Sequence, residues 1–225
     1  MKNSYALITG ASSGIGEEIA KNLAKKGYNL ILTARREDLL DKLAQDLRKK
    51  YNIDVSVIAK DLSKYETPKE ILSFCEKNNY RVDLLVNNAG YGIKTSFHET
   101  SLEDEEDFIR VLGTSVIMLT KLFLPKMISN GEGKIMIVSS TAAFAPPSAI
   151  QPLYGPIKTF VNRFSDSINI NYKNRGITST AVCPGFTVTG FHTASGVQEQ
   201  MDRVPDFLVF SAKRIADEAV QATLA

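Results

Sequence analysis

Two side chains that could share an acid–base reaction stand four residues apart, Tyr154 and Lys158. On a helix, positions i and i+4 lie on one face, so the phenol and the ammonium can be held side by side. A fixed positive charge nearby lowers a phenol pKa from about 10 by roughly 1 to 3 units, toward the range in which a general acid works well. By itself, this spacing more often marks an ordinary surface face of a helix, so the interpretation depends on other motifs.

A glycine-rich turn stands far upstream of this pair, in the sequence TGASSGIG at residues 9–16. It lies between a predicted strand and a predicted helix, where glycine lets the backbone turn tightly and approach a pyrophosphate. The start of the helix adds N–H donors and the positive end of the helix dipole, and two serines add hydroxyls. We therefore predict a dinucleotide site formed by Gly10, Ser12, Ser13, Gly14, Ile15 and Gly16.

Two arginines, Arg35 and Arg36, follow Ala34 about twenty residues beyond this turn, where an acidic side chain would bind the ribose of NAD. A guanidinium can pair with a 2′-phosphate through charge-assisted, bidentate hydrogen bonds, whereas a carboxylate would repel it. These residues favour NADP(H) over NAD(H), with Arg35 as the better candidate. The alternative is a pair of solvated arginines at a helix start.

The composition is that of a soluble globular protein. The chain has 225 residues, 44% of them hydrophobic and 23% charged, and suits one domain spanning residues 1–225. A net charge of +2 with balanced signs gives no reason to expect a nucleic-acid partner. His98 and His192 have no second histidine or carboxylate at ligand spacing, so no metal site is predicted. The acidic run 103–107 follows Ser101, which can cap a helix there.

The cellular location is predicted from cysteines and apolar stretches. Cys75 and Cys183 lie far apart in the sequence and are expected to be free thiols of a reducing compartment. The first apolar strand begins within about four residues of the N-terminus, so we expect no signal peptide and a cytoplasmic location. The longest apolar stretch, 111–128, contains Lys121 and Pro125 and is typical of a buried helix rather than a membrane span.

Short β-branched runs alternate with longer helical patterns along the chain. We predict strands at 4–9, 29–34, 54–59, 82–87, 134–139 and 177–183. We predict helices near 14–26, 37–50, 67–78, 102–129, 152–173 and 212–224. This alternation requires parallel pairing, so the expected fold is α/β, a Rossmann-type doubly wound sheet in the order 3-2-1-4-5-6 with helices on both faces. The long irregular region at about 186–211 is expected to be a functional substrate loop.

Four separated motifs together resemble those of the short-chain dehydrogenase/reductase family over nearly the whole chain. They are TGASSGIG, NNAG at 87–90, Ser139-Ser140 with YGPIK at 154–158, and Pro184-Gly185 with Thr187 and Thr189. The resemblance implies that Tyr154 gives a proton to a carbonyl oxygen, and that Lys158 lowers the Tyr154 pKa and holds the nicotinamide ribose. It implies that Ser140 holds the substrate oxygen, with Thr141 as the competing alignment.

The same resemblance implies further cofactor contacts. Asp61 and Leu62 would lie at the adenine, although an Asp at a strand end is ordinarily a turn residue. Asn88, Ala89 and Gly90 would face the adenosine ribose, and Thr189 with the backbone at Thr187 would bind the carboxamide. The complete set expected around the nicotinamide end is Tyr154, Lys158, Pro184, Gly185, Thr187 and Thr189.

Two departures from the family pattern bear on activity. Leu112 occupies the position where the family helix usually carries an active-site Asn, so either solvent reaches Lys158 by another path, with help from Ser115, or proton transfer is slowed. Family members usually continue after the helix at 212–224 into a seventh strand, which this sequence does not include. We therefore expect a homodimer through the helices at 102–129 and 152–173, or a higher homo-oligomer, and have less reason to expect the usual tetramer. The expected activity is NADPH-dependent reduction of a ketone or aldehyde, including the 3-oxoacyl type. The alternative is a non-catalytic NADP(H)-binding or sensing module.

Aromatic and apolar residues flank the expected active site. They are Phe144, Pro146, Pro147, Ile150, Phe186 and Phe191. Such residues are as typical of simple packing as of an apolar substrate pocket, so both interpretations stay open.

Overall fold

Six parallel strands form one sheet in the order β3-β2-β1-β4-β5-β6, which confirms the predicted order. The structure is a computed structural model, and it describes residues 4–93, 95–146, 151–188 and 209–225. Each predicted strand is present within one residue of its predicted bounds. The strands are β1 (Ser4–Thr9), β2 (Asn29–Ala34), β3 (Val55–Ala59), β4 (Arg81–Asn87), β5 (Gly133–Val138) and β6 (Ile177–Val182).

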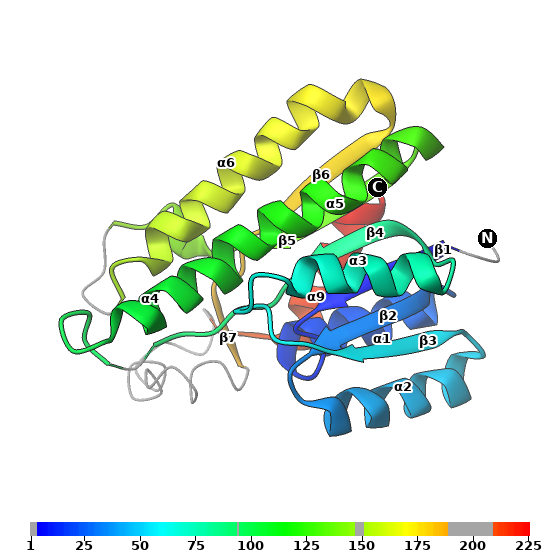
Figure 1. Ribbon diagram of the computed structural model, residues 1–225, viewed down its shortest axis with the longest axis horizontal. Coiled ribbons are helices and arrows are strands. Elements are labelled where there is room, and N and C mark those ends of the chain that lie inside the picture. The colour runs from blue at the N-terminus through cyan, green and yellow to red at the C-terminus, as the bar shows by residue number, and fades with distance from the viewer. Residues whose placement is uncertain (1–3, 94, 147–150, 189–208) are drawn as a thin grey trace.

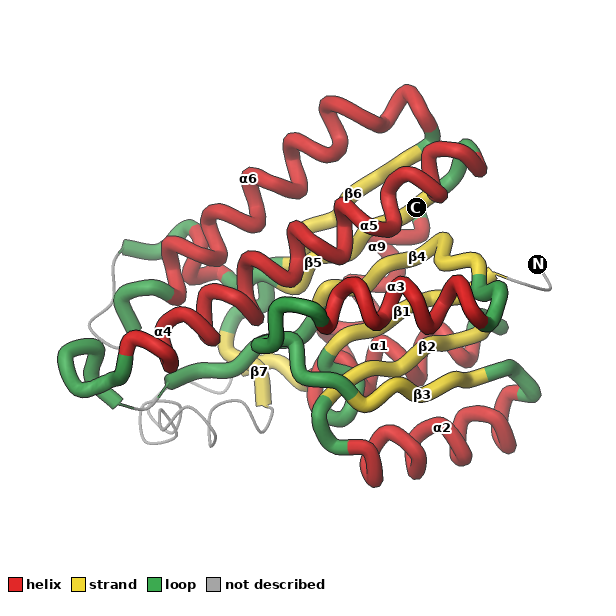
Figure 2. Tube along the Cα trace, in the orientation of Figure 1, coloured by secondary structure: helices red, strands yellow, loops and turns green. Residues whose placement is uncertain are grey.

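Helices cover both faces of this sheet (Figure 1). On one face, α1 (Gly14–Lys25), α2 (Glu37–Tyr51) and α9 (Ala212–Leu224) enclose one hydrophobic cluster. On the other, α3 (Thr67–Lys77), α4 (Leu102–Ile109), α5 (Ser115–Asn130) and α6 (Tyr154–Tyr172) enclose a second. Long loops gather at the carboxyl ends of the strands, toward α4 and β7 (Figure 2). Ligand sites of doubly wound sheets lie at this end.

The predicted helix at 102–129 consists of three parts. A π-helical segment at Arg110–Thr114 joins α4 to α5, and such segments are frequent at functional sites. The whole stretch Leu102–Asn130 is long and apolar enough to cross a membrane, but 56% of its most apolar window is buried inside the fold. Phe108 and Leu119 are fully buried in the core that faces the sheet. This degree of burial is typical of the core helix that the sequence predicted for this stretch.

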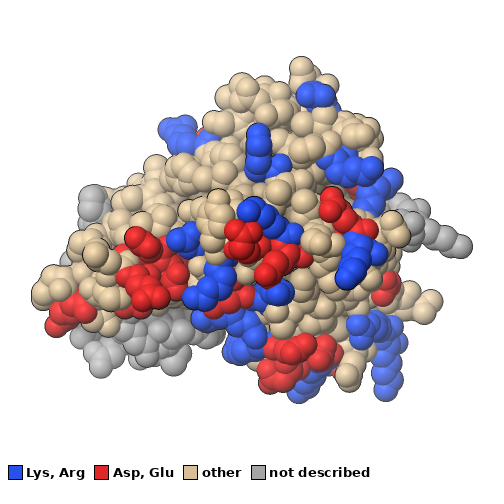
Figure 3. Space-filling view, viewed as in Figure 1, with Lys and Arg blue, Asp and Glu red and all other residues tan. Residues whose placement is uncertain are grey.

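The start of α4 has the predicted cap. Ser101 Oγ accepts a hydrogen bond from the Asp104 amide, and the Asp104 side chain accepts one from the Ser101 amide, which forms a capping box. Carboxylates gather over this part of the surface, while both signs of charge are interspersed over the rest of the same face (Figure 3). Both cysteines are free thiols, as predicted.

The region at 186–211 is not wholly irregular. Residues Phe186–Val188 form β7, which pairs in parallel with β8 (Val209–Ser211), and β8 leads directly into α9. This pairing was not predicted, because strands of three residues are too short to show a period. The predicted loop therefore begins and ends in a small sheet. Thr189, Phe191 and His192 lie outside the described residues.

Candidate functional site

The glycine-rich turn forms at the carboxyl end of β1, where the backbone needs glycine. Gly10 and Gly14 have φ angles of 66° and 61°, in the left-handed region that side chains disfavour. The following helix α1 begins at Gly14, and its N-cap residue Ser13 makes no side-chain capping bond. Ile15 packs against the hydrophobic cluster that α1, α2 and α9 enclose. The turn thus presents N–H groups at a helix start, as a pyrophosphate site requires.

Asn88 fixes the shape of this turn. Its amide Nδ2 donates to the carbonyls of Thr9 (2.9 Å) and Gly10 (3.2 Å). In return, Thr9 Oγ1 accepts hydrogen bonds from the amides of Asn88 (2.9 Å) and Ala89 (3.0 Å). A Cβ at Gly16 would lie 2.4 Å from Asn88 Nδ2 and 2.4 Å from the Gly10 carbonyl oxygen. The Asn88 side chain is therefore turned toward the glycine turn, and a ribose contact at this position falls to the backbone and to Ala89 and Gly90.

Of the two arginines after β2, Arg36 reaches the turn. Its Nη2 donates to Ser12 Oγ (3.0 Å) and to Ser13 Oγ (2.8 Å), and all three side chains lie at the surface of the site. The Arg35 guanidinium lies close enough to the Tyr91 phenol to act on the pKa of that phenol. The preference for Arg35 as the 2′-phosphate ligand stays a prediction, and the structure adds Arg36 as a candidate because its guanidinium lies at the glycine turn. Which of two adjacent side chains points at the turn depends on backbone direction after β2, and the sequence does not specify it.

The segment after β3 is shaped by local hydrogen bonds. Asp61 Oδ1 accepts from the Ser63 amide at 2.9 Å, which is the ordinary turn role of an Asp, and its backbone carbonyl accepts from Thr67 Oγ1 at 2.6 Å. The Leu62 side chain is only 6% exposed and packs in the core. Any contact of Leu62 with an adenine would therefore come from its backbone.

Ser140 and Tyr154 meet where β5 ends and α6 begins. Ser140 caps a short 3₁₀ turn at Thr141–Ala143 by accepting from the Ala142 amide at 3.1 Å. Burial raises the pKa of the Tyr154 phenol, and a hydrogen bond with the Ser140 side chain acts in the opposite direction. The structure thus joins two of the three predicted catalytic residues, and Ser140 rather than Thr141 is the partner of Tyr154.

Lys158, the third predicted catalytic residue, is buried one turn along α6. Its ammonium donates to the Val138 carbonyl at 2.9 Å and lies 5.6 Å from the centroid of the Tyr154 ring. Burial lowers the Lys158 pKa from 10.5 to about 8, and the nearby Cys183 acts weakly in the opposite direction. The expectation that Lys158 depresses the Tyr154 pKa is not met. The ammonium is directed at a carbonyl, and burial of the phenol dominates.

Leu112 lies inside the π-helical segment, and its side chain lies close to Gly90. It is 2% exposed, and a Cβ built on Gly90 would lie 3.8 Å from Leu112 Cγ. The Ser115 hydroxyl donates to the Val111 carbonyl at 2.8 Å within its own helix. Ser115 is therefore engaged locally and does not replace the hydrogen-bonding group that Leu112 lacks.

The segment after β6 is tied to the Ser140 turn. The Thr141 amide donates to the carbonyl of Pro184 at 2.9 Å, and Thr187 Oγ1 donates to the carbonyl of Gly185 at 3.0 Å. Thr187 is 4% exposed, so the residue is buried. Pro184 and Gly185 thus lie beside the turn that Ser140 caps, and the predicted contacts of Pro184, Gly185 and Thr187 with the nicotinamide end stay a prediction.

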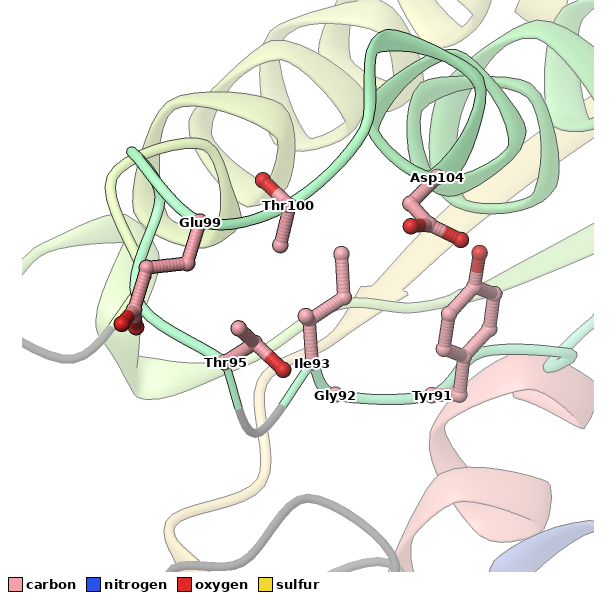
Figure 4. Close-up of a pocket in the computed structure, with 7 residues that line it drawn as sticks. All are labelled: Tyr91, Gly92, Ile93, Thr95, Glu99, Thr100 and Asp104. Atoms are coloured by element: carbon pink, nitrogen blue, oxygen red, sulfur yellow. The ribbon is translucent and has the colours of Figure 1, made fainter.

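A pocket of about 290 Å³ opens between the loop after β4 and the start of α4 (Figure 4). The Tyr91 phenol points toward the Asp104 carboxylate across it, and Glu99 and Thr100 line the opposite side. Two carboxylates make this pocket negative at neutral pH, so it is unsuited to a phosphate group. Ser140, Tyr154 and Lys158 do not line it.

Residues that could hold a dinucleotide therefore converge at one end of the sheet. The glycine turn fits a pyrophosphate because Gly10 and Gly14 adopt positive φ angles there and the turn leads directly into the N-terminus of α1. Arg36 supplies a cation beside that turn. The phenol, the hydroxyl and the ammonium supply a proton donor and hydrogen-bond donors. Within the described ranges, no group of three His, Cys, Asp or Glu side chains could hold a metal ion.

Comparisons with known proteins agree with this arrangement. A family model described as short chain dehydrogenase matches residues 4–200. The very-long-chain 3-oxoacyl-CoA reductase-A of Danio rerio is 32% identical over 191 residues, which cover 82% of this chain and 58% of that protein. The chain thus spans less than two thirds of the length of this relative.

Two solved structures are similar over almost the whole chain. A short-chain dehydrogenase from Sphingobium yanoikuyae in complex with NADPH has a TM-score of 0.89 and 30% identity, covering 97% of this chain and 83% of its own. An alcohol dehydrogenase from the archaeon Thermococcus sibiricus complexed with 5-hydroxy-NADP has a TM-score of 0.83 and 30% identity, covering 98% and 90%.

Proposed function

Because the chain belongs to the short-chain dehydrogenase family, we propose that it is an NADPH-dependent oxidoreductase that reduces the carbonyl group of a ketone or aldehyde. The observation that carries this proposal is the hydrogen bond between Ser140 and Tyr154, with the Lys158 ammonium one turn along the same helix. Pure nucleotide binding has no need for these three side chains together.

The bound dinucleotide would supply the hydride. Tyr154 donates its phenolic proton to the developing alkoxide oxygen, and its raised pKa keeps that proton in place at neutral pH. Ser140 orients the phenol and holds the same oxygen. Lys158 has a pKa of about 8 and is mainly charged at neutral pH, so it can hold ribose hydroxyls with its three N–H donors.

We propose NADP(H) as the preferred cofactor, with Arg36 as the 2′-phosphate ligand. Its guanidinium already lies within hydrogen-bond distance of Ser12 and Ser13, beside the turn that fits the pyrophosphate. Arg36→Ala should raise the NADPH dissociation constant by about tenfold to a hundredfold, since a charge-assisted hydrogen bond contributes roughly 1.5–3 kcal/mol. The matched control is Arg35→Ala, which should change it less. Equal effects, or a larger effect at Arg35, would contradict this assignment.

We propose an apolar carbonyl substrate, including 3-oxoacyl thioesters. Phe144 follows the Ser140 turn and is 74% exposed, and Phe186 follows Gly185 and is 48% exposed. Exposed aromatic side chains on two segments beside the catalytic residues suit an apolar ligand. The relative from Danio rerio is named a reductase of 3-oxoacyl-CoA, which supports the same substrate class.

A homodimer through α5 and α6 is proposed as well. Ile117 on α5 and Phe160 and Ile170 on α6 are exposed apolar side chains on neighbouring helices. Sedimentation velocity of the wild-type chain and of Phe160→Glu tests this, because a charge in such an interface should dissociate the dimer. A cytoplasmic location remains a proposal, supported by the two free thiols.

The test of the proposed function is NADPH oxidation by the wild-type chain over a panel of carbonyls. The panel should include short and long 3-oxoacyl thioesters, bulky ketones and aldehydes. Turnover that increases with the apolar surface of the substrate is the expected result. NADPH binding without oxidation on every carbonyl would support the non-catalytic alternative, for which the apolar Leu112 is the specific observation.

A further inference from the structure

Ser139, the residue before the catalytic serine, makes a contact that the catalytic roles do not explain. Its hydroxyl donates to the backbone carbonyl of Lys158 at 3.1 Å, between two residues 19 positions apart. Ser139 is 4% exposed, and its own amide donates to the Val182 carbonyl at 2.7 Å. The hydroxyl is therefore buried and held in place by the neighbouring strand.

Lys158 is consequently attached to the end of β5 at two points. The Val138 carbonyl accepts from its ammonium at 2.9 Å, and the Ser139 hydroxyl donates to its backbone carbonyl at 3.1 Å. One contact fixes the tip of the side chain, and the other fixes the helix from which it extends. Val138, the last residue of β5, and Ser139, which follows it, thus determine where the Lys158 nitrogen lies.

The far end of α6 is attached in a different way. Asn169 Oδ1 accepts from the Ser179 amide at 2.8 Å, and Asn169 Nδ2 donates to the Ser179 carbonyl. The hydroxyls of Ser165 and Ser179 lie 2.7 Å apart. These contacts hold α6 on β6 but lie about two to three turns beyond Lys158, since a helical turn takes about 3.6 residues. At the catalytic end of the helix, the side-chain bond from β5 to the α6 backbone comes from Ser139.

We propose that Ser139 is a positioning residue for Lys158: its hydroxyl fixes α6 against β5 so that the lysine nitrogen is held where it serves the reaction. This inference rests on the proposed function, because it assigns Lys158 a role in turnover. A residue of this kind affects the rate through geometry, and a misplacement of about 1 Å can lower a rate about a hundredfold.

The experiment compares two alanine variants of the full chain on the carbonyl that the wild type reduces best. Ser139→Ala removes the bond to Lys158, and Ser165→Ala is the control, since it removes a buried hydroxyl bond from the same helix. Both should lower the melting temperature to a similar extent. Only Ser139→Ala should lower kcat, by about tenfold or more, because a small shift of Lys158 is sufficient. Ser139→Thr keeps the hydroxyl and should restore most of kcat.

Several outcomes would overturn the proposal. They are an unchanged kcat in Ser139→Ala, and equal losses of kcat in the two alanine variants, which would indicate a general structural role. The crystal structure of Ser139→Ala gives a measure that does not depend on turnover, and an unmoved Lys158 nitrogen there would also contradict the proposal. If the wild type reduced no carbonyl, the proposed function would fail. The position of the Lys158 nitrogen in the crystal structure of Ser139→Ala would then decide whether Ser139 positions Lys158.

Discussion

Replacing Gly16 by alanine tests how the glycine turn is built. An added Cβ would lie 2.4 Å from Asn88 Nδ2 and 2.4 Å from the carbonyl oxygen of Gly10. Real Cβ atoms do not approach other atoms so closely, so the Asn88 side chain or the turn must move. Movement of Asn88 breaks its bonds to the Thr9 and Gly10 carbonyls. The substitution therefore acts on the turn and on the end of β4 together.

The expected loss of stability follows from these contacts. Overpacking of a filled site costs about 1–3 kcal/mol, and each lost hydrogen bond costs about 1 kcal/mol. With the loss of both bonds, Gly16→Ala should lower the free energy of unfolding by about 3–5 kcal/mol. The affinity for NADPH should fall as well, because the turn no longer presents its N–H groups in the same geometry.

Urea unfolding followed by circular dichroism measures the stability, and titration of NADPH fluorescence measures the affinity. Gly113→Ala is the matched control, because a Cβ there would meet Ile157 at an ordinary 3.6 Å. It should change both quantities little. If Gly16→Ala unfolded at the same urea concentration as the wild type and bound NADPH equally well, Asn88 would not hold the turn as described.

The remaining predictions concern Lys158 and the start of α4. Burial lowers the pKa of Lys158 from 10.5 to about 8. Between these two pH values the unfolded chain binds more protons than the folded chain, so this group makes the free energy of unfolding rise with pH. Relative to Lys158→Met, the wild type should therefore gain about 3 kcal/mol in unfolding free energy from pH 8 to pH 10.5, and a constant difference would contradict the burial effect. Ser101→Ala should lower the unfolding free energy by about 1 kcal/mol through loss of the capping box, whereas Ser167→Ala, which removes an exposed bond to the Arg163 carbonyl, should change it by less.

Local patterns in the sequence were sufficient for the sheet and for the glycine turn. The strand order follows from the alternation of strands and helices, and the turn follows from glycines between β1 and α1. The spacing of Tyr154 and Lys158 correctly placed both on one helix, α6. These features depend on residues close in the sequence or on general rules of chain topology.

Contacts between distant residues were not predictable in the same way. The bonds from Asn88 to Thr9 join residues 79 positions apart, and no pattern in either segment specifies them. Whether Arg35 or Arg36 contacts Ser12 and Ser13 depends on which side of the backbone faces the turn. The pKa of Lys158 depends on burial by the whole fold, and its spacing from Tyr154 therefore suggested the wrong effect on the phenol.

The central claim is that the Tyr154 phenol gives the proton that completes carbonyl reduction. The most direct measurement compares kcat and the NADPH dissociation constant of Tyr154→Phe with those of the wild type. Loss of the general acid should lower kcat by about a hundredfold to ten-thousandfold while NADPH still binds, because the glycine turn and Arg36 are untouched. A Tyr154→Phe variant that turned over at the wild-type rate would contradict the account.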